Sequence, residues 1–388
     1  MILKVDDPTT TAEVSSILAE VIRSAVDPQA REIDQNGAYP RAALRALGDA
    51  GLLGVLSSRD VGGLGLGLRD AVRTVEALAG SCASTAMVVT MHLAATAVIE
   101  AHGPIEVRRS IAAGDHISTL AFSELGSRSH FWAPLGTATA AADGVELNGS
   151  KSWVTSAGEA DSYVWSSRPV GDSTGMTLWL VPAGTTGLAV NGGFDGVALR
   201  GNASRPMAAS ALRLPESAMI AADGAGLEVA LAAALPTFLV LSAACSLGLV
   251  ETLLAEAATH LTETRLEHLG VTLAQRPASR AAFAKLRIRA DEARAFLADT
   301  LVALETGRPD ATLRVLQVKA VAAEAAAAVG DGVLRLCGGS ALRRERDLER
   351  HFRDSLAARV MAPTTEALHD FVGRACLGLP LLDEQPAP

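Results

Sequence analysis

Hydrophobic residues in the first third of the chain recur with the period of an α-helix. Four apolar residues share the i, i+3, i+4, i+7 spacing of one helical face: Val14, Ile17, Leu18 and Val21. A second helix is predicted to begin at Pro40 and to end near Gly51. Residues 71–101 are rich in Ala, Val and Met, which predicts further buried helix.

The pattern changes to short strands between about residues 117 and 220. Two turn dipeptides, Asp143-Gly144 and Asn148-Gly149, enclose a short alternating segment. Residues 162–165 alternate in the same way, and the apolar run 176–181 ends at Pro182, as a buried strand does. Strands at this spacing predict a β-barrel or sandwich of about a hundred residues.

Long helices return from about Ala222, interrupted only around residues 307–309. The run Val229–Val250 holds no charged residue and has the hydropathy of a membrane span. Its flanks are Glu228 and Glu251 rather than Lys or Arg, so we expect a buried core helix and no membrane span. The fold predicted is α+β, with a helical domain at 1–116, a β-domain at 117–221 and a helical bundle at 222–388.

Composition and charge exclude some classes of protein. The 388 residues are 49% hydrophobic and 20% charged, which excludes a disordered chain. The formal net charge of −9 argues against a protein whose main role is to bind nucleic acid or an anionic membrane surface. Four widely spaced cysteines predict buried free thiols, and the N-terminus predicts no signal peptide, so we expect a cytoplasmic location and no bound metal.

The candidate chemistry is modest when each motif is considered alone. The glycine run 62–67 lacks the GxGxxG spacing and predicts an inter-helix turn. Glu124 leads into a polar loop, for which a solvated connection is favoured, and Trp153 is favoured as a core residue. The alternating charges of residues 343–354 predict an exposed, salt-bridged helix.

Four of these segments occur in one order, and in this order the chain resembles the acyl-CoA dehydrogenase family over nearly its whole length. Residues 51–54 (GLLG) with 61–65 (VGGLG) resemble the family's first glycine-rich turn. Residues 123–130 (SELGSRSH) resemble its TEPGAGSD loop, and residues 149–156 (GSKSWVTS) resemble its GxKxWITN strand. Cys337-Gly338-Gly339, followed by Glu349-Arg350 and Arg353-Asp354, resembles its late GG…ER…RD signature.

The resemblance implies FAD, an acyl-thioester substrate and subunits that share the cofactor site. The FAD-contacting positions that it implies are Phe122, Ser123, Ser129, Trp153, Thr155, Arg265, Arg335, Gly339 and Thr364. Trp153 would lie against the flavin ring and the Thr155 hydroxyl would reach flavin N5, while Arg265, Arg335 and Gly339 would come from a neighbouring subunit. The resemblance also implies a homotetramer or dimer, with an electron-transfer flavoprotein or a flavin reductase as the redox partner.

The chain departs from the family at the catalytic base. Family dehydrogenases remove the proton α to the thioester carbonyl with a glutamate, but the corresponding position here is Ala362. The alternative position on the first long helix of the C-terminal domain is Phe238. A relocated base is therefore expected, with Glu366 as the first candidate and His369 or Glu124 as others.

Three functions remain open on the sequence. The favoured one is an acyl-thioester dehydrogenase with a relocated base. The second is a flavin-dependent monooxygenase of the same superfamily, which needs no such base. The third is a flavin- or acyl-binding protein whose catalytic activity has decayed.

Overall fold

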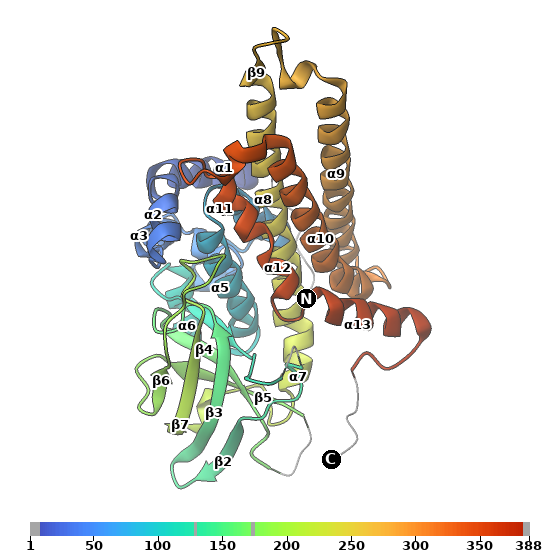
Figure 1. The fold of residues 1–388 in the computed structure, drawn as a ribbon. Coiled ribbons are helices and arrows are strands. Elements are labelled where there is room, and N and C mark those ends of the chain that lie inside the picture. The colour runs from blue at the N-terminus through green and yellow to red at the C-terminus, as the bar shows by residue number, and fades with distance from the viewer. Residues whose placement is uncertain (1–7, 128–129, 172–174, 383–388) are drawn as a thin grey trace. The chain divides into compact units, whose positions relative to one another are not determined.

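The computed structural model describes residues 8–127, 130–171 and 175–382, and the chain forms two compact units, Met1–Leu241 and Ser242–Pro388. The first unit contains helices followed by β-sheets, and the second is helical (Figure 1). This order of secondary structure confirms the predicted α+β fold. The predicted domain boundaries after residues 116 and 221 stay predictions.

The first unit opens with six α-helices and four short helical turns. The α-helices are α1 Pro8–Val21, α2 Ala30–Asn36, α3 Arg41–Asp49, α4 Leu68–Ser81, α5 Ala83–His102 and α6 Ile105–Ala112. The turns are η1 Ile22–Val26, η2 Asp27–Gln29, η3 Leu52–Gly54 and η4 Arg59–Val61. The glycine run 62–67 connects η4 to α4, which confirms the predicted inter-helix turn.

The predicted helical faces are mostly buried. Val14, Leu18 and Val21 are buried on α1, but Ile17 is 45% exposed, so its prediction as a core residue was wrong. The buried face of α1 is therefore narrower than the i, i+3, i+4, i+7 spacing predicts, and Ile17 lines a surface depression. Gly51, as predicted, follows the end of α3, in a left-handed conformation with φ 72°.

Two four-stranded sheets follow the helices in the first unit. One sheet has the order β1-β4-β5-β8 and the other β2-β3-β7-β6. The strands are β1 Ser118–Ala121, β2 Thr137–Ala141, β3 Gly144–Val154, β4 Ser162–Ser167, β5 Thr177–Pro182, β6 Leu188–Val190, β7 Arg205–Leu214 and β8 Met219–Ile220. Tyr163 and Trp179 from the first sheet share one apolar core with Leu147 and Met207 from the second, which confirms a sandwich.

The dipeptide Asn148-Gly149 is not the turn that the sequence predicted. Strand β3 continues through it to Val154, since a β-bulge shifts the register between β3 and β7 at this point. Ala211 on β7, with φ 48°, is the additional residue, and its backbone N–H donates to Asn148 Oδ1 at 2.8 Å. The Asn side chain therefore completes the ladder instead of forming a turn.

Helix α8, Leu235–Glu263, begins in the first unit and continues into the second. Short segments precede it, η5 Glu216–Ala218, α7 Gly226–Val229 and η6 Ala230–Ala234. The helices of the second unit that follow are α9 Pro277–Glu305, α10 Ala311–Cys337, α11 Leu348–Ser355, α12 Ala357–Val360 and α13 Thr365–Leu377. A small hairpin, β9 Arg265–Leu266 and β10 Val271–Thr272, and two turns, η7 Leu273–Gln275 and η8 Gly338–Leu342, connect them.

The charge-free run, residues 229–250, lies in helical segments that are mostly buried within the protein. Two helical stretches, Ala83–His102 and Gly226–Glu263, are long and apolar enough to cross a membrane, and 83% and 72% of their most apolar windows are buried within the protein. In the second unit, Val250, Leu253 and Leu254 of α8 form one core with residues of α9 and α10, which run side by side (Figure 1). Such burial is typical of core helices.

Two further predictions need correction. Of residues 343–354 only residues 348–354 lie in a helix, α11, and Arg350 and Asp354 are buried rather than exposed. Cys82, Cys245 and Cys337 are buried free thiols as predicted, but Cys376 is exposed. Cys376 lies in the last turn of α13, whose apolar neighbour Leu377 is also 76% exposed.

Candidate functional site

Trp153 is an exposed aromatic residue at the end of β3. Its side chain is 69% exposed, so the preference for a core position was wrong. The residue has φ 56°, a left-handed conformation that residues with a side chain seldom adopt. This backbone conformation directs the indole ring away from the sandwich core. By contrast, Tyr163 and Trp165 of the other sheet are buried in that core.

The segment after β1 lies beside the end of β3. An antiparallel bridge joins Glu124 to Lys151, and the Ser152 N–H donates to the Ser123 carbonyl at 2.9 Å. Three of the predicted site residues, Phe122, Ser123 and Trp153, therefore lie on adjacent backbone segments.

Beneath these residues lies a buried ion pair. The Lys151 ammonium is 2.6 Å from Glu124 Oε1, and the two side chains are 0% and 3% exposed. Lys151 also donates to the carbonyl and the hydroxyl of Ser166, each at 2.8 Å, so all three of its protons have acceptors. Burial lowers the pKa of Lys151 to about 8, against the opposing effect of Glu124.

The environment of Glu124 overturns the prediction of a solvated connection. Its carboxylate accepts hydrogen bonds from the backbone N–H groups of Leu135 and Gly136 in addition to that from Lys151. The carboxylate is thus engaged by three donors within the protein, and its side chain is only 3% exposed, so a substrate has no access to it. The geometry therefore does not support Glu124 as the catalytic base.

Thr155 lies two residues after Trp153 and is buried, with its hydroxyl 3.3 Å from Ser204 Oγ. The next residue, Ser156, also has positive φ, at 60°. Each such residue costs roughly 1–3 kcal/mol and persists only where its surroundings hold it. Two of them in four residues show that this segment is held in a specific conformation, which is typical of functional sites.

The residues of the first unit fit an isoalloxazine ring. An exposed indole offers a flat apolar face, and the adjacent hydroxyl and backbone groups offer hydrogen bonds. Phe194 lies edge-on to Trp153, with 6.4 Å between the ring centroids, and supports one side of the indole. Ser129, one of the predicted FAD contacts, lies outside the described residues. In the described ranges no group of three or more His, Cys, Asp or Glu could hold a metal ion.

Three of the predicted residues of the second unit gather at one end of it. His260 in the last turns of α8 lies 3.2 Å from Thr264 Oγ1 and 3.5 Å from Ser340 Oγ, which joins the β9–β10 hairpin to η8. Arg265 is on this hairpin and Gly339 is on η8, while Arg335 precedes η8 on α10. The Arg265 guanidinium donates to the Gly270 carbonyl, and exposed Arg335 pairs with Asp331 at 2.9 Å.

Thr364 and Glu366 lie at the start of α13. The Thr364 hydroxyl caps this helix by accepting from the Ala367 N–H at 3.3 Å, and Glu366 in its first turn is exposed. The preceding segment is held by Lys319 of α10, which is buried and donates to the carbonyls of Ala358, Met361 and Pro363 at 2.7–2.9 Å. Burial lowers the pKa of Lys319 to about 7, and Glu366 opposes this effect.

The two groups in the second unit are far apart. Lys319 and Arg335 are sixteen residues apart on α10, which corresponds to roughly 24 Å along a helix that rises 1.5 Å per residue. A single copy of this unit therefore does not bring Thr364 together with Arg265, Arg335 and Gly339. Sequence reasoning overlooked Lys319, although a lone lysine in an apolar, Ala-rich helix is a recognisable signal.

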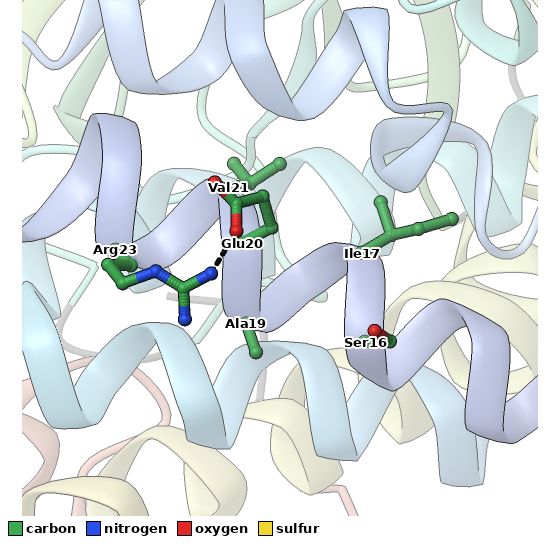
Figure 2. Close-up of a pocket in the computed structure, with 6 residues that line it drawn as sticks. All are labelled: Ser16, Ile17, Ala19, Glu20, Val21 and Arg23. Carbon is green, nitrogen blue, oxygen red and sulfur yellow. Dashed lines mark hydrogen bonds and ion pairs between the residues drawn. The ribbon is translucent and has the colours of Figure 1, made fainter.

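A surface depression of about 440 Å³ lies on α1 and η1 (Figure 2). It is lined by Ser16, Ile17, Ala19, Glu20, Val21 and Arg23, and Figure 2 shows Glu20 paired with Arg23 beside it. None of the predicted site residues lines it.

Comparison with known proteins gives consistent matches along the chain. Residues 10–113, 119–211 and 224–377 match the models of the acyl-CoA dehydrogenase N-terminal, middle and C-terminal domains, which together cover most of the chain. Short-chain specific acyl-CoA dehydrogenase from Homo sapiens mitochondria is 27% identical over 346 residues, which covers 87% of this chain and 83% of the relative. Mitochondrial isobutyryl-CoA dehydrogenase from Dictyostelium discoideum is 24% identical and covers 93% of this chain and 88% of the relative.

Solved structures share the fold. Butyryl-CoA dehydrogenase from Megasphaera elsdenii superposes with a TM-score of 0.89 at 21% identity, covering 97% of this chain and 100% of that one. The structure described as PigA with FAD and proline superposes with a TM-score of 0.88 at 20% identity, with the same coverage.

Proposed function

Because this chain belongs to the acyl-CoA dehydrogenase family, we propose that it is an FAD-dependent oxidoreductase that oxidises the α,β-bond of an acyl thioester. The observation that carries the proposal is the exposed Trp153 beside the Thr155 hydroxyl, on a backbone segment held in a left-handed conformation. The acyl-CoA dehydrogenases among the relatives support the substrate class.

FAD supplies a hydride acceptor at its flavin N5 when it is bound. In the proposal, Phe122 and Ser123 would border the ring, the Trp153 indole would cover one face and the Thr155 hydroxyl would hydrogen-bond near N5. Ser129, Arg265, Arg335, Gly339 and Thr364 bind the rest of the cofactor. Since Thr364 and Arg335 lie at separate ends of one copy, the site needs a second copy of the chain, which supports a homo-oligomer, a dimer or a tetramer.

Glu366 is proposed as the base that removes the α-proton. It lies four residues after Ala362, in the first turn of α13, and its exposed carboxylate is accessible to a substrate. His369 is one turn further along the same helix and is also exposed. The two electrons would leave to an electron-transfer flavoprotein, and a cytoplasmic location is proposed with this role.

A flavin-dependent monooxygenase is the second candidate. The absence of a carboxylate at both Ala362 and Phe238 favours it, because oxygen activation needs no α-proton base. The same fold occurs in a structure that contains FAD and proline rather than an acyl-CoA. In this case a flavin reductase would supply the electrons. A decayed flavin- or acyl-binding protein is the third candidate.

Two measurements on the purified protein distinguish these functions, namely anaerobic spectroscopy of the flavin and oxygen uptake in air. The dehydrogenase predicts that the flavin absorbance bleaches on addition of an acyl-CoA, with straight-chain and branched short acyl groups tested first. The monooxygenase predicts no bleaching by substrate, but oxygen consumption once a reductase is present. A binding protein shows neither response, and a protein that does not bind FAD contradicts all the flavoenzyme functions.

A further inference from the structure

The left-handed residues of the first unit are concentrated in two facing segments. Four of the six described non-glycine residues with positive φ fall in residues 153–156 and 199–203, namely Trp153, Ser156, Leu199 and Ala203. The two segments are joined by backbone hydrogen bonds, from the Ser156 N–H to the Asn202 carbonyl at 2.9 Å and from the Ala157 N–H to the Ala203 carbonyl at 3.1 Å. The presentation of Trp153 and Thr155 therefore depends on a pair of strained segments that support each other.

The end of α2 and its connection to α3 contact both segments. The Tyr39 hydroxyl donates to Ser156 Oγ at 2.9 Å. Arg200 of the second segment donates to the Asp34 carbonyl at 2.7 Å. Gly201 passes so close to Ala38 that an added Cβ would lie 2.6 Å from its carbonyl oxygen. The helical part of the unit thus forms a support behind the two segments.

Tyr39 is itself fixed in place. The Arg41 guanidinium lies 5.7 Å from the centroid of its ring and pairs with Glu159, which follows the first segment. Burial raises the pKa of the Tyr39 hydroxyl well above its ordinary value, so it remains a neutral hydrogen-bond donor at all physiological pH values.

We propose that Tyr39 is a positioning residue for the cofactor, because its hydrogen bond holds Ser156 in the left-handed conformation that presents Thr155 and Trp153. The inference rests on the proposed FAD site. A φ near 60° is energetically unfavourable for a residue with a side chain. Loss of the Tyr39 hydrogen bond therefore allows Ser156 to return to negative φ. Such a change alters the direction of the backbone on both sides of Ser156. It moves the Thr155 hydroxyl away from Ser204 Oγ.

The test compares FAD binding to the wild-type protein with binding to the Tyr39→Phe variant. The substitution removes one hydroxyl and keeps the ring, so the chain still folds. We expect the dissociation constant for FAD to rise about 3- to 10-fold, as the loss of one hydrogen bond predicts. A structural role alone would lower Tm without affecting the bound flavin, so the visible spectrum and midpoint potential of the bound flavin are measured as well, and both should shift.

A second variant tests the same bond from the other side. Glycine adopts φ 60° freely, so Ser156→Gly removes both the acceptor and the strain that the Tyr39 hydrogen bond offsets. It should bind FAD about as tightly as the wild-type protein, and the double variant Tyr39→Phe/Ser156→Gly should bind FAD more tightly than Tyr39→Phe alone.

Tyr163→Phe is the matched control, because this hydroxyl lies in the same sandwich but accepts from the Gly158 N–H. It should lower Tm and leave FAD affinity and the flavin spectrum unchanged. Unchanged affinity and spectrum in Tyr39→Phe, or an equal change in Tyr163→Phe, would overturn the role of Tyr39 and leave the FAD site intact. A wild-type protein that binds no FAD would instead overturn the proposed function, and the role of Tyr39 with it.

Discussion

Lys151 and Glu124 form an ion pair in the interior of the first unit, with 2.6 Å between Nζ and Oε1. The pair connects the segment that contains Phe122 and Ser123 to the strand that contains Trp153. Neither charge has access to water, so each depends on the other for its stability in the folded protein.

Removal of both partners should cost less than the sum of the two single removals. Glu124→Gln or Lys151→Met should each lower the free energy of unfolding by about 3–5 kcal/mol, because a buried charge is left unpaired. The double variant should lose less than the sum of the two, as measured in a urea-unfolding double-mutant cycle. The pair Glu146–Arg213, at 2.8 Å with side chains 25% and 64% exposed, is the control and should couple by less than about 1 kcal/mol. Additive losses at Lys151 and Glu124 would show that the two charges are not interdependent.

Trp153→Leu should impair FAD binding more than folding. The side chain is 69% exposed, so Tm should change little. Loss of an aromatic stacking partner should raise the dissociation constant for FAD by about 5- to 100-fold, by analogy with base stacking. Titration with FAD measures the effect, and Ile105→Ala, which changes an exposed apolar residue on α6, is the control. Equal affinity in the two variants would place the flavin elsewhere.

Glu366→Gln should slow the reduction of bound flavin by an acyl-CoA at least about 100-fold, since general bases contribute factors of this size. The rate of bleaching in an anaerobic stopped-flow experiment measures this step. Asp370→Asn changes an exposed acid one turn further along α13, where it pairs with Arg374, and should leave the rate unchanged. A rate in Glu366→Gln equal to that of Asp370→Asn would exclude Glu366 and make His369 the next residue to test.

The folded protein should lose stability between about pH 6.5 and pH 4 because of His92. This residue is fully buried, its Nε2–H donates to the Leu53 carbonyl and its Nδ1 accepts from the Ser118 N–H. Burial lowers its pKa from 6.5 to about 4. In this pH window the unfolded chain takes up a proton that the folded chain does not, so acidification favours unfolding.

The loss should approach about 3 kcal/mol at pH 4, because each unit of pKa shift corresponds to about 1.4 kcal/mol. Urea unfolding at pH 4 and pH 7 measures it. His92→Gln offers one donor and one acceptor without titrating, so it should flatten the pH dependence. Some dependence should remain, because burial also lowers the pKa of His116. An unaltered profile in His92→Gln would contradict the assignment.

Lys319→Met should destabilise the second unit by about 2–5 kcal/mol, because three backbone carbonyls lose their donor. Denaturant unfolding and proteolysis near residues 358–363 measure the loss. Lys285→Met on α9 replaces an exposed lysine and is the control. If the two variants are equally stable, Lys319 does not hold this segment.

The sequence predicted the order and type of the elements because these depend on local periodicity. The spacing of α1, the glycine after α3 and the apolar run of β5 are all properties of neighbouring residues. The same reasoning failed at Asn148-Gly149, since the bulge that carries the strand through this dipeptide depends on Ala211, which is distant in sequence.

The candidate site was harder to predict because its residues depend on long-range contacts. Glu124 is a charged residue in a polar loop, and only the approach of Lys151 makes its burial favourable. Trp153 has a large apolar side chain of the kind common in protein cores, and only its positive φ directs it outward. The sequence singled out both residues as candidates, but their burial and exposure depend on the fold.

The apolar helix α8 has a consequence for biosynthesis. Its residues Val250, Leu253 and Leu254 are buried by α9 and α10, whose contacts extend to Val333. A ribosome that adds about 5–20 residues per second needs roughly 4–17 s to reach that point. During this interval the most apolar stretch of the nascent chain lacks its partners, so chaperones that bind hydrophobic segments should determine the yield of folded protein.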